Sequence, residues 1–156
     1  MKTKEIWCIG NPLLKDDGAG PALFALLHGT LPGDVALVDC GTVPENYLSR
    51  LKRNPPSVLV IADTADMGLP GGSIRRMTLS QAGGVSFGTH GIPLSILLEP
   101  FLPFMDIIVI GIQPQTRGFG EGVSPRVHAS LGLLADLLRE GKWDSIDPYQ
   151  EKRSPR

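Results

Sequence analysis

The sequence predicts an α/β protein with three layers, α/β/α, in which helices cover both faces of a mostly parallel, twisted sheet of about five strands. Short apolar runs alternate with segments of helical spacing along most of the chain. The run 58–62 is continuous and β-branched, as strands buried on both faces are. The connection 64–71 is too short for a parallel crossover, so the strand after it should be an antiparallel or edge strand.

The elements follow in order, each marked by its own pattern. Strands are expected at 4–9, 35–40, 58–62, 72–79 and 106–112. Helices are expected at 18–29 and 44–53, then from 93 to a stop at Pro100, and finally at 124–140. Proline lies in the first turn of two helices, at Pro44 and Pro125, and Gly141 caps the last one. The glycine-rich segment 81–89 is predicted to be a loop.

The length of 156 residues is usual for one domain, and we expect a single α/β domain over 1–141 followed by a polar C-terminal tail over 142–156. The formal net charge of −1 comes from acidic and basic residues spread along the chain, which argues against nucleic acid or an anionic membrane surface as partner. No apolar run approaches the length of a membrane span, and no signal-peptide segment precedes the first strand. We therefore expect a cytoplasmic protein.

The two cysteines, Cys8 and Cys40, are too few for a disulfide framework and lack metal-ligand spacing. Each falls in a predicted strand. We expect both to act as small buried hydrophobic residues.

The segment 10–20 joins the first strand to the first helix and carries two adjacent carboxylates, Asp16 and Asp17. In open α/β sheets ligands bind in the crevice outside the carboxyl ends of the strands, so this loop is a candidate site. Carboxylates before a helix also satisfy its free N–H groups. That structural role accounts for one of the two but rarely requires both.

Two further residues lie where they could converge on this loop. Asp63 ends the third predicted strand, and His90 stands at the mouth of a helix. Alone, each is usually structural or solvated. Together with Asp17 they form two carboxylates and one imidazole, which is a recognised open metal site with free coordination positions.

A competing motif is G-x-S-x-G, the nucleophile-elbow pattern, which Gly84-Val85-Ser86-Phe87-Gly88 matches. Ser86 would be the nucleophile and His128 the base. The motif needs a strand running into it and a helix leaving directly, but the preceding residues 80–83 are polar and small. A flexible loop is the preferred interpretation.

Several blocks of the chain recur together in one known family. They are Gly10-Asn11 with Leu13 and Asp16-Asp17-Gly18, Gly41-Thr42-Val43-Pro44-Glu45-Asn46, Asp63-Thr64-Ala65-Asp66-Met67-Gly68, Thr89-His90 with Pro93-Leu94, and Gly111-Ile112-Gln113-Pro114. With these blocks the chain resembles the hydrogenase maturation endopeptidases over about 6–119. It looks closest to the branch that serves formate-hydrogenlyase-type hydrogenases, the hydrogenase 3 branch.

The resemblance implies an aspartyl-type endopeptidase that removes the C-terminal extension of a nickel-loaded large-subunit precursor of a [NiFe] hydrogenase. By motif, the family's nickel-contacting residues fall on Asp17, Asp63 and His90. The nickel is expected to come with the substrate, and other divalent metals can occupy such a site. The implied partner is the precursor, with no nucleic acid or membrane, and the implied protein is a monomer.

For the chemistry, we expect Asp17, Asp63 and His90 to complete the nickel coordination, with the metal positioning or polarising the scissile region. As an alternative to ligating the metal, one carboxylate orients the attacking water as general base, and Asp17 is preferred for this role because the flexible Gly18 follows it. Two other hypotheses stay open. One is a nickel-binding maturation chaperone that does not cut, and the other is a serine hydrolase that uses Ser86.

Overall fold

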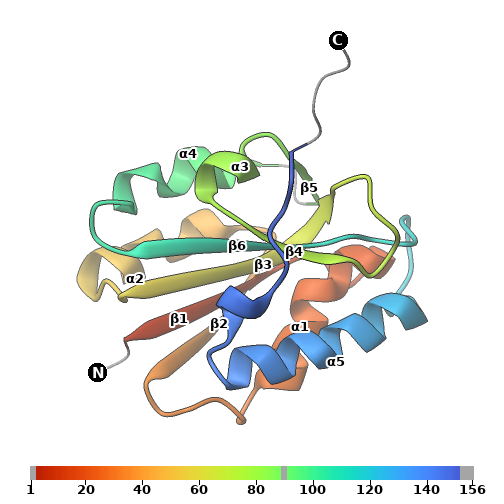
Figure 1. Ribbon diagram of the computed structural model, residues 1–156, viewed down its shortest axis with the longest axis horizontal. Helices are drawn as coiled ribbons and strands as arrows, with labels where there is room; N and C mark the ends of the chain where they lie inside the picture. The colour runs from red at the N-terminus through yellow and green to blue at the C-terminus, as the bar shows by residue number, and fades with distance from the viewer. Residues whose placement is uncertain (1–2, 89–90, 152–156) are drawn as a thin grey trace.

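A mostly parallel sheet runs through the centre of the molecule (Figure 1). The computed structural model describes residues 3–88 and 91–151. In these ranges the strands are β1 (Lys4–Ile9), β2 (Val35–Gly41), β3 (Val58–Asp66), β4 (Ile74–Met77), β5 (Ser86–Phe87) and β6 (Asp106–Ile112). Their order is β2-β1-β3-β6-β4, with β5 paired to β3. β4 and β5 pair antiparallel with their neighbours, and the other pairs are parallel.

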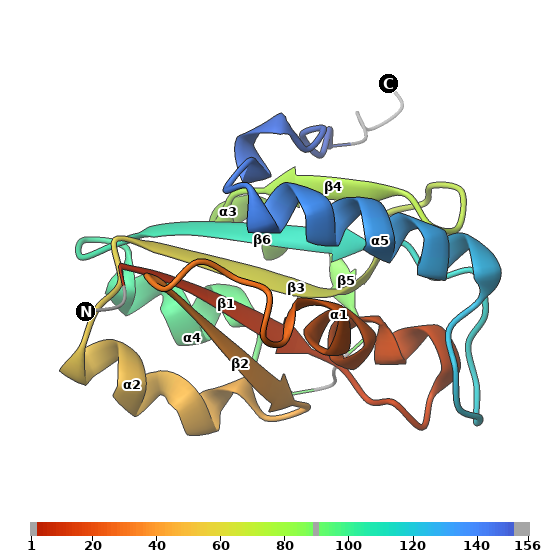
Figure 2. The same cartoon turned by 90° about the horizontal axis from the view of Figure 1, so that it is seen from below.

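Helices cover both faces of this sheet (Figures 1 and 2). The α-helices are α1 (Ala19–Leu27), α2 (Leu48–Arg53), α3 (Leu79–Ala82), α4 (Leu94–Leu98) and α5 (Pro125–Arg139), and the 3₁₀ turns are η1 (Lys15–Gly18), η2 (Pro44–Tyr47), η3 (Glu99–Phe101) and η4 (Trp143–Ser145). One face carries α1 and α5, and the other carries α2, α3 and α4. The predicted three-layer class, with an antiparallel strand at the edge, is confirmed. Within the described ranges, no helix is both long enough and apolar enough to cross a membrane.

The apolar run of β3 contributes side chains to two separate hydrophobic cores, one on each face of the sheet. Leu59 and Ile61 pack toward α2 and α4, whereas Val60 and Ala62 pack toward α1 and α5. This alternation is the two-residue period of a strand, and all four residues are fully buried. The continuous apolar pattern therefore marks a strand covered on both faces, as predicted.

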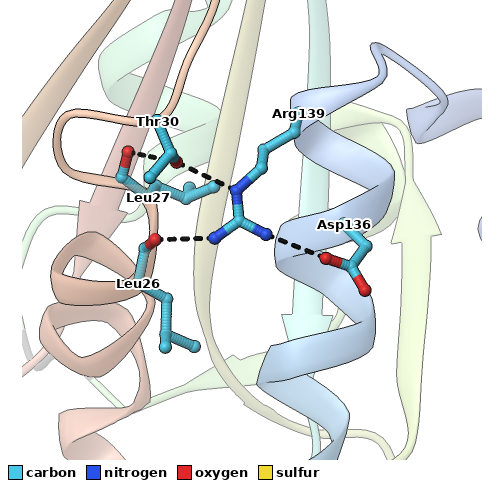
Figure 3. A network of polar contacts seen from close by, with 5 residues as sticks. All are labelled: Leu26, Leu27, Thr30, Asp136 and Arg139. Atoms are coloured by element: carbon cyan, nitrogen blue, oxygen red, sulfur yellow. Dashed lines mark hydrogen bonds and ion pairs between the residues drawn. The ribbon is translucent and has the colours of Figure 1, made fainter.

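Arg139 fastens the last helix to the first (Figure 3). Its Nη2 donates to the Leu26 carbonyl at 2.7 Å, and its Nε donates to Thr30 Oγ1 at 2.9 Å. The Thr30 hydroxyl donates onward to the Leu27 carbonyl at 2.8 Å. These bonds satisfy carbonyl groups that the end of α1 leaves without intrahelical partners. Asp136, one turn back on α5, holds the guanidinium at 2.8 Å.

β3 is longer than its predicted range, 58–62. β6 stays paired with it through Asp63 and Thr64, and β5 then pairs with Ala65 and Asp66. β5 lies in a segment expected to be a loop, which also contains the end of α3. Thr78 begins α3 with a capping box, its hydroxyl accepting from the Gln81 N–H at 3.1 Å.

The segment after Gly141, expected to be a loosely held tail, packs on the sheet edge as far as Tyr149. Trp143 and Ile146 are buried in the core beneath α1 and α5. The Tyr149 N–H then donates to the carbonyl of Arg76 in β4 at 2.7 Å. Backbone pairing of this kind occupies the open edge of β4.

Candidate active site

The two predicted carboxylates, Asp17 and Asp63, lie where the strand order of the sheet reverses. The chain runs from β1 outward to β2 and returns to β3 on the other side of β1. Such a reversal opens a crevice outside the carboxyl ends of the two strands, where α/β proteins bind ligands. The loop that carries Asp17 leaves β1 here. β1 and β3 pair only as far as Ala62, so Asp63 is the first residue of β3 beyond that pairing.

The hydroxyl of Thr64 links these two carboxylates. Its Oγ1 lies 3.2 Å from Asp17 Oδ1 and 3.5 Å from Asp63 Oδ1. Asp63 is fully buried, whereas Asp17 is half-buried. A hydroxyl has a single proton and donates to one acceptor at a time. Because one hydroxyl reaches both groups, the structure brings Asp17 and Asp63 together.

Gly88 packs directly against this group. Its N–H donates to the Thr64 carbonyl at 2.9 Å. A Cβ at this position would lie 2.5 Å from Thr64 Oγ1 and 2.8 Å from Asp17 Oδ1, closer than van der Waals contact allows. Only glycine therefore fits without moving the two side chains. Neither Thr64 nor Gly88 was predicted as a site residue from the sequence, although Thr64 adjoins the predicted site residue Asp63.

The third predicted residue, His90, lies outside the described residues. Within residues 3–88 and 91–151, no group of three or more His, Cys, Asp or Glu side chains is placed to hold a metal ion. The described part of the candidate site therefore consists of the two carboxylates and the threonine hydroxyl. Carboxylate oxygens favour hard divalent cations and also ligate nickel and zinc when imidazole joins them.

Asp16, the neighbour of Asp17, has a different role. Its carboxylate is fully buried and accepts hydrogen bonds from two regions far along the chain. The backbone N–H groups of Gln115 and Thr116 donate to Oδ2 at 2.8 Å, and the Ser124 N–H donates to Oδ1 at 2.6 Å. The hydroxyls of Thr116 and Ser124 also donate to Oδ2. Asp16 thus fastens the loop 10–18 to the loop before α5, while the Asp17 carboxylate accepts from the Thr64 hydroxyl.

These hydrogen bonds set the charge of Asp16. Burial by itself would raise the pKa of the Asp16 carboxyl, but the donors of Ser124, Thr116 and Gln115 outweigh it and hold the pKa below its ordinary value. The ionised form is therefore the one that the fold selects.

Close backbone packing holds the site loop in place. The Asn11 N–H donates to the Asp17 carbonyl at 2.9 Å. A Cβ on Gly10 would collide with that same carbonyl, and one on Gly18 would lie 2.9 Å from the Cα of Pro12. From the sequence, Gly18 was expected to provide flexibility beside Asp17. The structure differs, because Gly18 is buried and serves close approach.

Gln113 joins the ends of β3 and β6 beside the site. Its side-chain oxygen accepts from the Met67 N–H at 2.6 Å, and its Nε2 donates to Asp66 Oδ1 at 3.3 Å. The Gly68 N–H donates to the same Asp66 oxygen at 3.2 Å. Two of the sequence blocks, 63–68 and 111–114, therefore form one hydrogen-bonded unit.

The nucleophile-elbow hypothesis is not supported. Ser86 is exposed in the two-residue strand β5, which pairs antiparallel with β3 at Asp66. Among residues 3–88 and 91–151, the next helix after Ser86 is α4, which begins at Leu94. The described residues therefore do not show the strand-turn-helix context that the G-x-S-x-G motif requires.

The cysteines are structural, as expected. Both are buried and neither forms a disulfide. Burial raises the pKa of the Cys8 thiol to about 12, and burial likewise raises the pKa of Cys40. Both thiols are therefore protonated and unreactive at neutral pH.

Solved structures with this fold define a class of enzyme. A crystal structure described as the hydrogenase 3 maturation protease superposes with a TM-score of 0.86 at 28% identity, covering 96% of this chain and 98% of the other. A crystal structure of a [NiFe] hydrogenase maturation protease from Thermococcus kodakarensis superposes with a TM-score of 0.80 at 31% identity, covering 90% and 93%. Both are maturation proteases.

The sequence comparisons agree with this class. A family model described as hydrogenase maturation protease matches residues 25–140. The hydrogenase 3 maturation protease of Escherichia coli is 34% identical over 119 residues, which are 75% of this chain and 76% of that protein. The chain belongs to the hydrogenase maturation protease family and is an endopeptidase. The hypotheses of a non-cutting chaperone and of a serine hydrolase are therefore not favoured.

Proposed function

We propose that this enzyme removes the C-terminal extension of a [NiFe] hydrogenase large-subunit precursor, and that Asp17, Asp63 and His90 recognise the nickel already loaded in that substrate. The observation that carries the proposal is the convergence of Asp17 and Asp63 on the Thr64 hydroxyl, at 3.2 and 3.5 Å. His90 belongs to the proposal because of its motif and because it follows Gly88, which packs on Asp17, by two positions.

The donor set suits a cation that arrives with the substrate. Two carboxylates and an imidazole have little intrinsic preference for nickel over zinc or copper, so delivery of the metal within the precursor supplies the discrimination. When bound, the nickel contributes Lewis-acid polarisation of the scissile region. Asp63 is buried and would hold its position, whereas Asp17 is half-buried and accessible to water.

Asp17 is therefore the proposed general base. Its free carboxylate oxygen takes a proton from water while the water oxygen bonds to the scissile carbonyl carbon. The carbon–nitrogen bond then breaks, and the proton passes to the departing amine. The hydrogen bond from Thr64 and the packing of Gly88 hold the carboxylate in one orientation for this transfer.

Mass spectrometry of the precursor tests the proposal. The large-subunit precursor from the same organism is prepared in nickel-loaded and nickel-free forms, and each is incubated with the enzyme. Loss of a C-terminal peptide from the nickel-loaded form alone is expected. Equal loss from both forms would mean that Asp17 and Asp63 do not recognise nickel. No loss from either form would overturn the assigned substrate.

A substitution at Gly88 tests the geometry of the carboxylates. Gly88→Ala is expected to lower the rate of precursor cleavage by about 100-fold, because its Cβ displaces Thr64 and Asp17 by a substantial fraction of an ångström. Gly132→Ala is the matched control, since a Cβ there meets nothing within 4 Å and Gly132 lies in the middle of α5. Cleavage is followed by mass spectrometry and folding by circular dichroism. Equal rates for the two folded variants would contradict the assigned geometry.

A further inference from the structure

The site loop is fastened to the segment 113–123, which leads from β6 toward α5. The Lys15 N–H donates to the Gly120 carbonyl at 2.8 Å, and the Gly120 N–H donates to the Leu13 carbonyl at 2.9 Å. The buried Asp16 carboxylate joins the same two segments a second time, through the backbone N–H groups that donate to it. The backbone of both segments is therefore held in place before any partner binds.

These paired segments present two large apolar side chains to solvent. Leu13 is 57% exposed, and Phe119, which precedes Gly120, is 91% exposed. Exposed aromatic residues on a fixed backbone are effective anchors in protein interfaces, because little conformational entropy is lost when they become buried. Two such residues on neighbouring, hydrogen-bonded segments indicate a surface that contacts another protein.

Lys15 adds a positive charge to this surface. Its side chain runs along the second segment, since a Cβ on Gly120 would lie 3.4 Å from the Lys15 Cε. No hydrogen bond or ion pair of the Lys15 ammonium group is found within residues 3–88 and 91–151. In these ranges Lys15 is also the only residue other than glycine with a positive φ, +50°. Because glycine adopts this conformation without strain, a lysine here indicates that the side chain has a use.

The position and shape of the surface indicate what it contacts. Lys15 and Asp17 share the 3₁₀ turn η1, so a protein that is cut at Asp17 lies against this surface. The Phe119 side chain projects from the molecule and suits a hollow on its partner. A folded protein offers a preformed hollow, whereas a flexible peptide does not. The unpaired ammonium group of Lys15 favours a carboxylate within or beside that hollow.

We infer that Leu13, Lys15 and Phe119 form a docking surface for the folded body of the large-subunit precursor, where they contact an apolar hollow that carries an Asp or Glu side chain. This inference rests on the proposed function. The occupant is the folded body and not the C-terminal extension. Docking here holds the body of the substrate beside Asp17, so that the enzyme recognises a folded precursor before it cuts.

Kinetics with single substitutions test this docking surface. Phe119→Ala and Lys15→Gln are each expected to raise KM for the nickel-loaded precursor about 10-fold and to leave kcat unchanged, because they remove binding that does not change during the reaction. Lys15→Arg keeps the charge and is expected to keep the wild-type KM. Phe104→Ala and Lys52→Gln are the matched controls. Both residues are exposed and lie shortly before β6 and β3 begin, at the opposite end of the sheet from Asp17.

Changes in the substrate identify the occupant. Each Asp and Glu on the precursor surface around the nickel is replaced by Asn or Gln. One replacement is expected to raise KM for the wild-type enzyme about 10-fold and to cause no further rise with Lys15→Gln. A precursor whose extension is shortened to a few residues is expected to keep the ratio of KM between Phe119→Ala and the wild type.

Four outcomes would overturn the docking surface and leave the proposed function intact. They are a wild-type KM for Phe119→Ala or for Lys15→Gln, additive rises in KM for every acidic replacement, loss of the KM ratio when the extension is shortened, and loss of cleavage by the wild type on that shortening. Failure of the wild type to cut the full nickel-loaded precursor would instead refute the proposed function.

Discussion

Asp17→Asn is expected to lower the rate of precursor cleavage by at least about 100-fold while leaving the fold intact. The amide cannot take a proton from water, and it is a much poorer metal ligand than a carboxylate. Its oxygen can still accept the hydrogen bond that Thr64 donates to Asp17 at 3.2 Å. Because Asp17 is half-buried, we expect the free energy of unfolding to change by less than about 1 kcal/mol.

The measurement pairs a cleavage assay with thermal unfolding. Asp34→Asn serves as the control, since Asp34 precedes β2 and lies at the opposite ends of the strands, where it pairs with Lys4 at 3.8 Å. The control variant is expected to cut at the wild-type rate. Wild-type cleavage by a folded Asp17→Asn enzyme would remove Asp17 from the mechanism.

Substitution of the neighbouring residue, Asp16, should mainly affect stability instead of catalysis. Asp16→Asn is expected to lower the free energy of unfolding by about 3–5 kcal/mol, because donors approach both carboxylate oxygens and the new NH₂ group must face some of them. For a chain of this size that loss lowers Tm by on the order of 10 °C. Denaturant unfolding of the two variants side by side measures the contrast. Equal stability of Asp16→Asn and Asp17→Asn would contradict the structural role of Asp16.

The same residue makes stability depend on pH. The folded pKa of Asp16 lies below its ordinary value of 3.8, so the folded state binds fewer protons there than the unfolded state. Its contribution is fully present above that ordinary value and is lost as the pH falls through the folded pKa. Below about pH 4 the unfolding free energy of the wild type should therefore fall more steeply than that of Asp16→Asn.

Local patterns predicted most of the fold because most elements carry their own signals. The apolar run of β3 and the proline at the start of α5 each mark an element from within it. The extension of β3 to Asp66 could not be predicted in this way, since it depends on pairing with β5 and β6. The capping box of α3 was present as Thr78-Leu79-Ser80-Gln81, but its first two residues were assigned to the strand expected at 72–79, which ends at Met77.

The site was predictable only in part. Asp17 and Asp63 lie together because both follow strand ends at the point where the strand order reverses. Their proximity could be predicted from their positions in the sequence and from the fold class. The separation of roles between Asp16 and Asp17 was not predictable, because the partners of Asp16 lie about 100 residues away in sequence. The position of Gly88 also depends on tertiary contacts, and the role of His90 stays a prediction.

The contacts of Asp16 also bear on when the enzyme becomes competent. Contacts between distant parts of a chain form late in folding, because closing a long loop costs entropy before the contact is made. The loop that carries Asp17 acquires its last support only when Ser124 has been synthesised and α5 has docked. A growing chain on the ribosome therefore contains Asp17 and Asp63 long before their carboxylates are held in the arrangement proposed for catalysis.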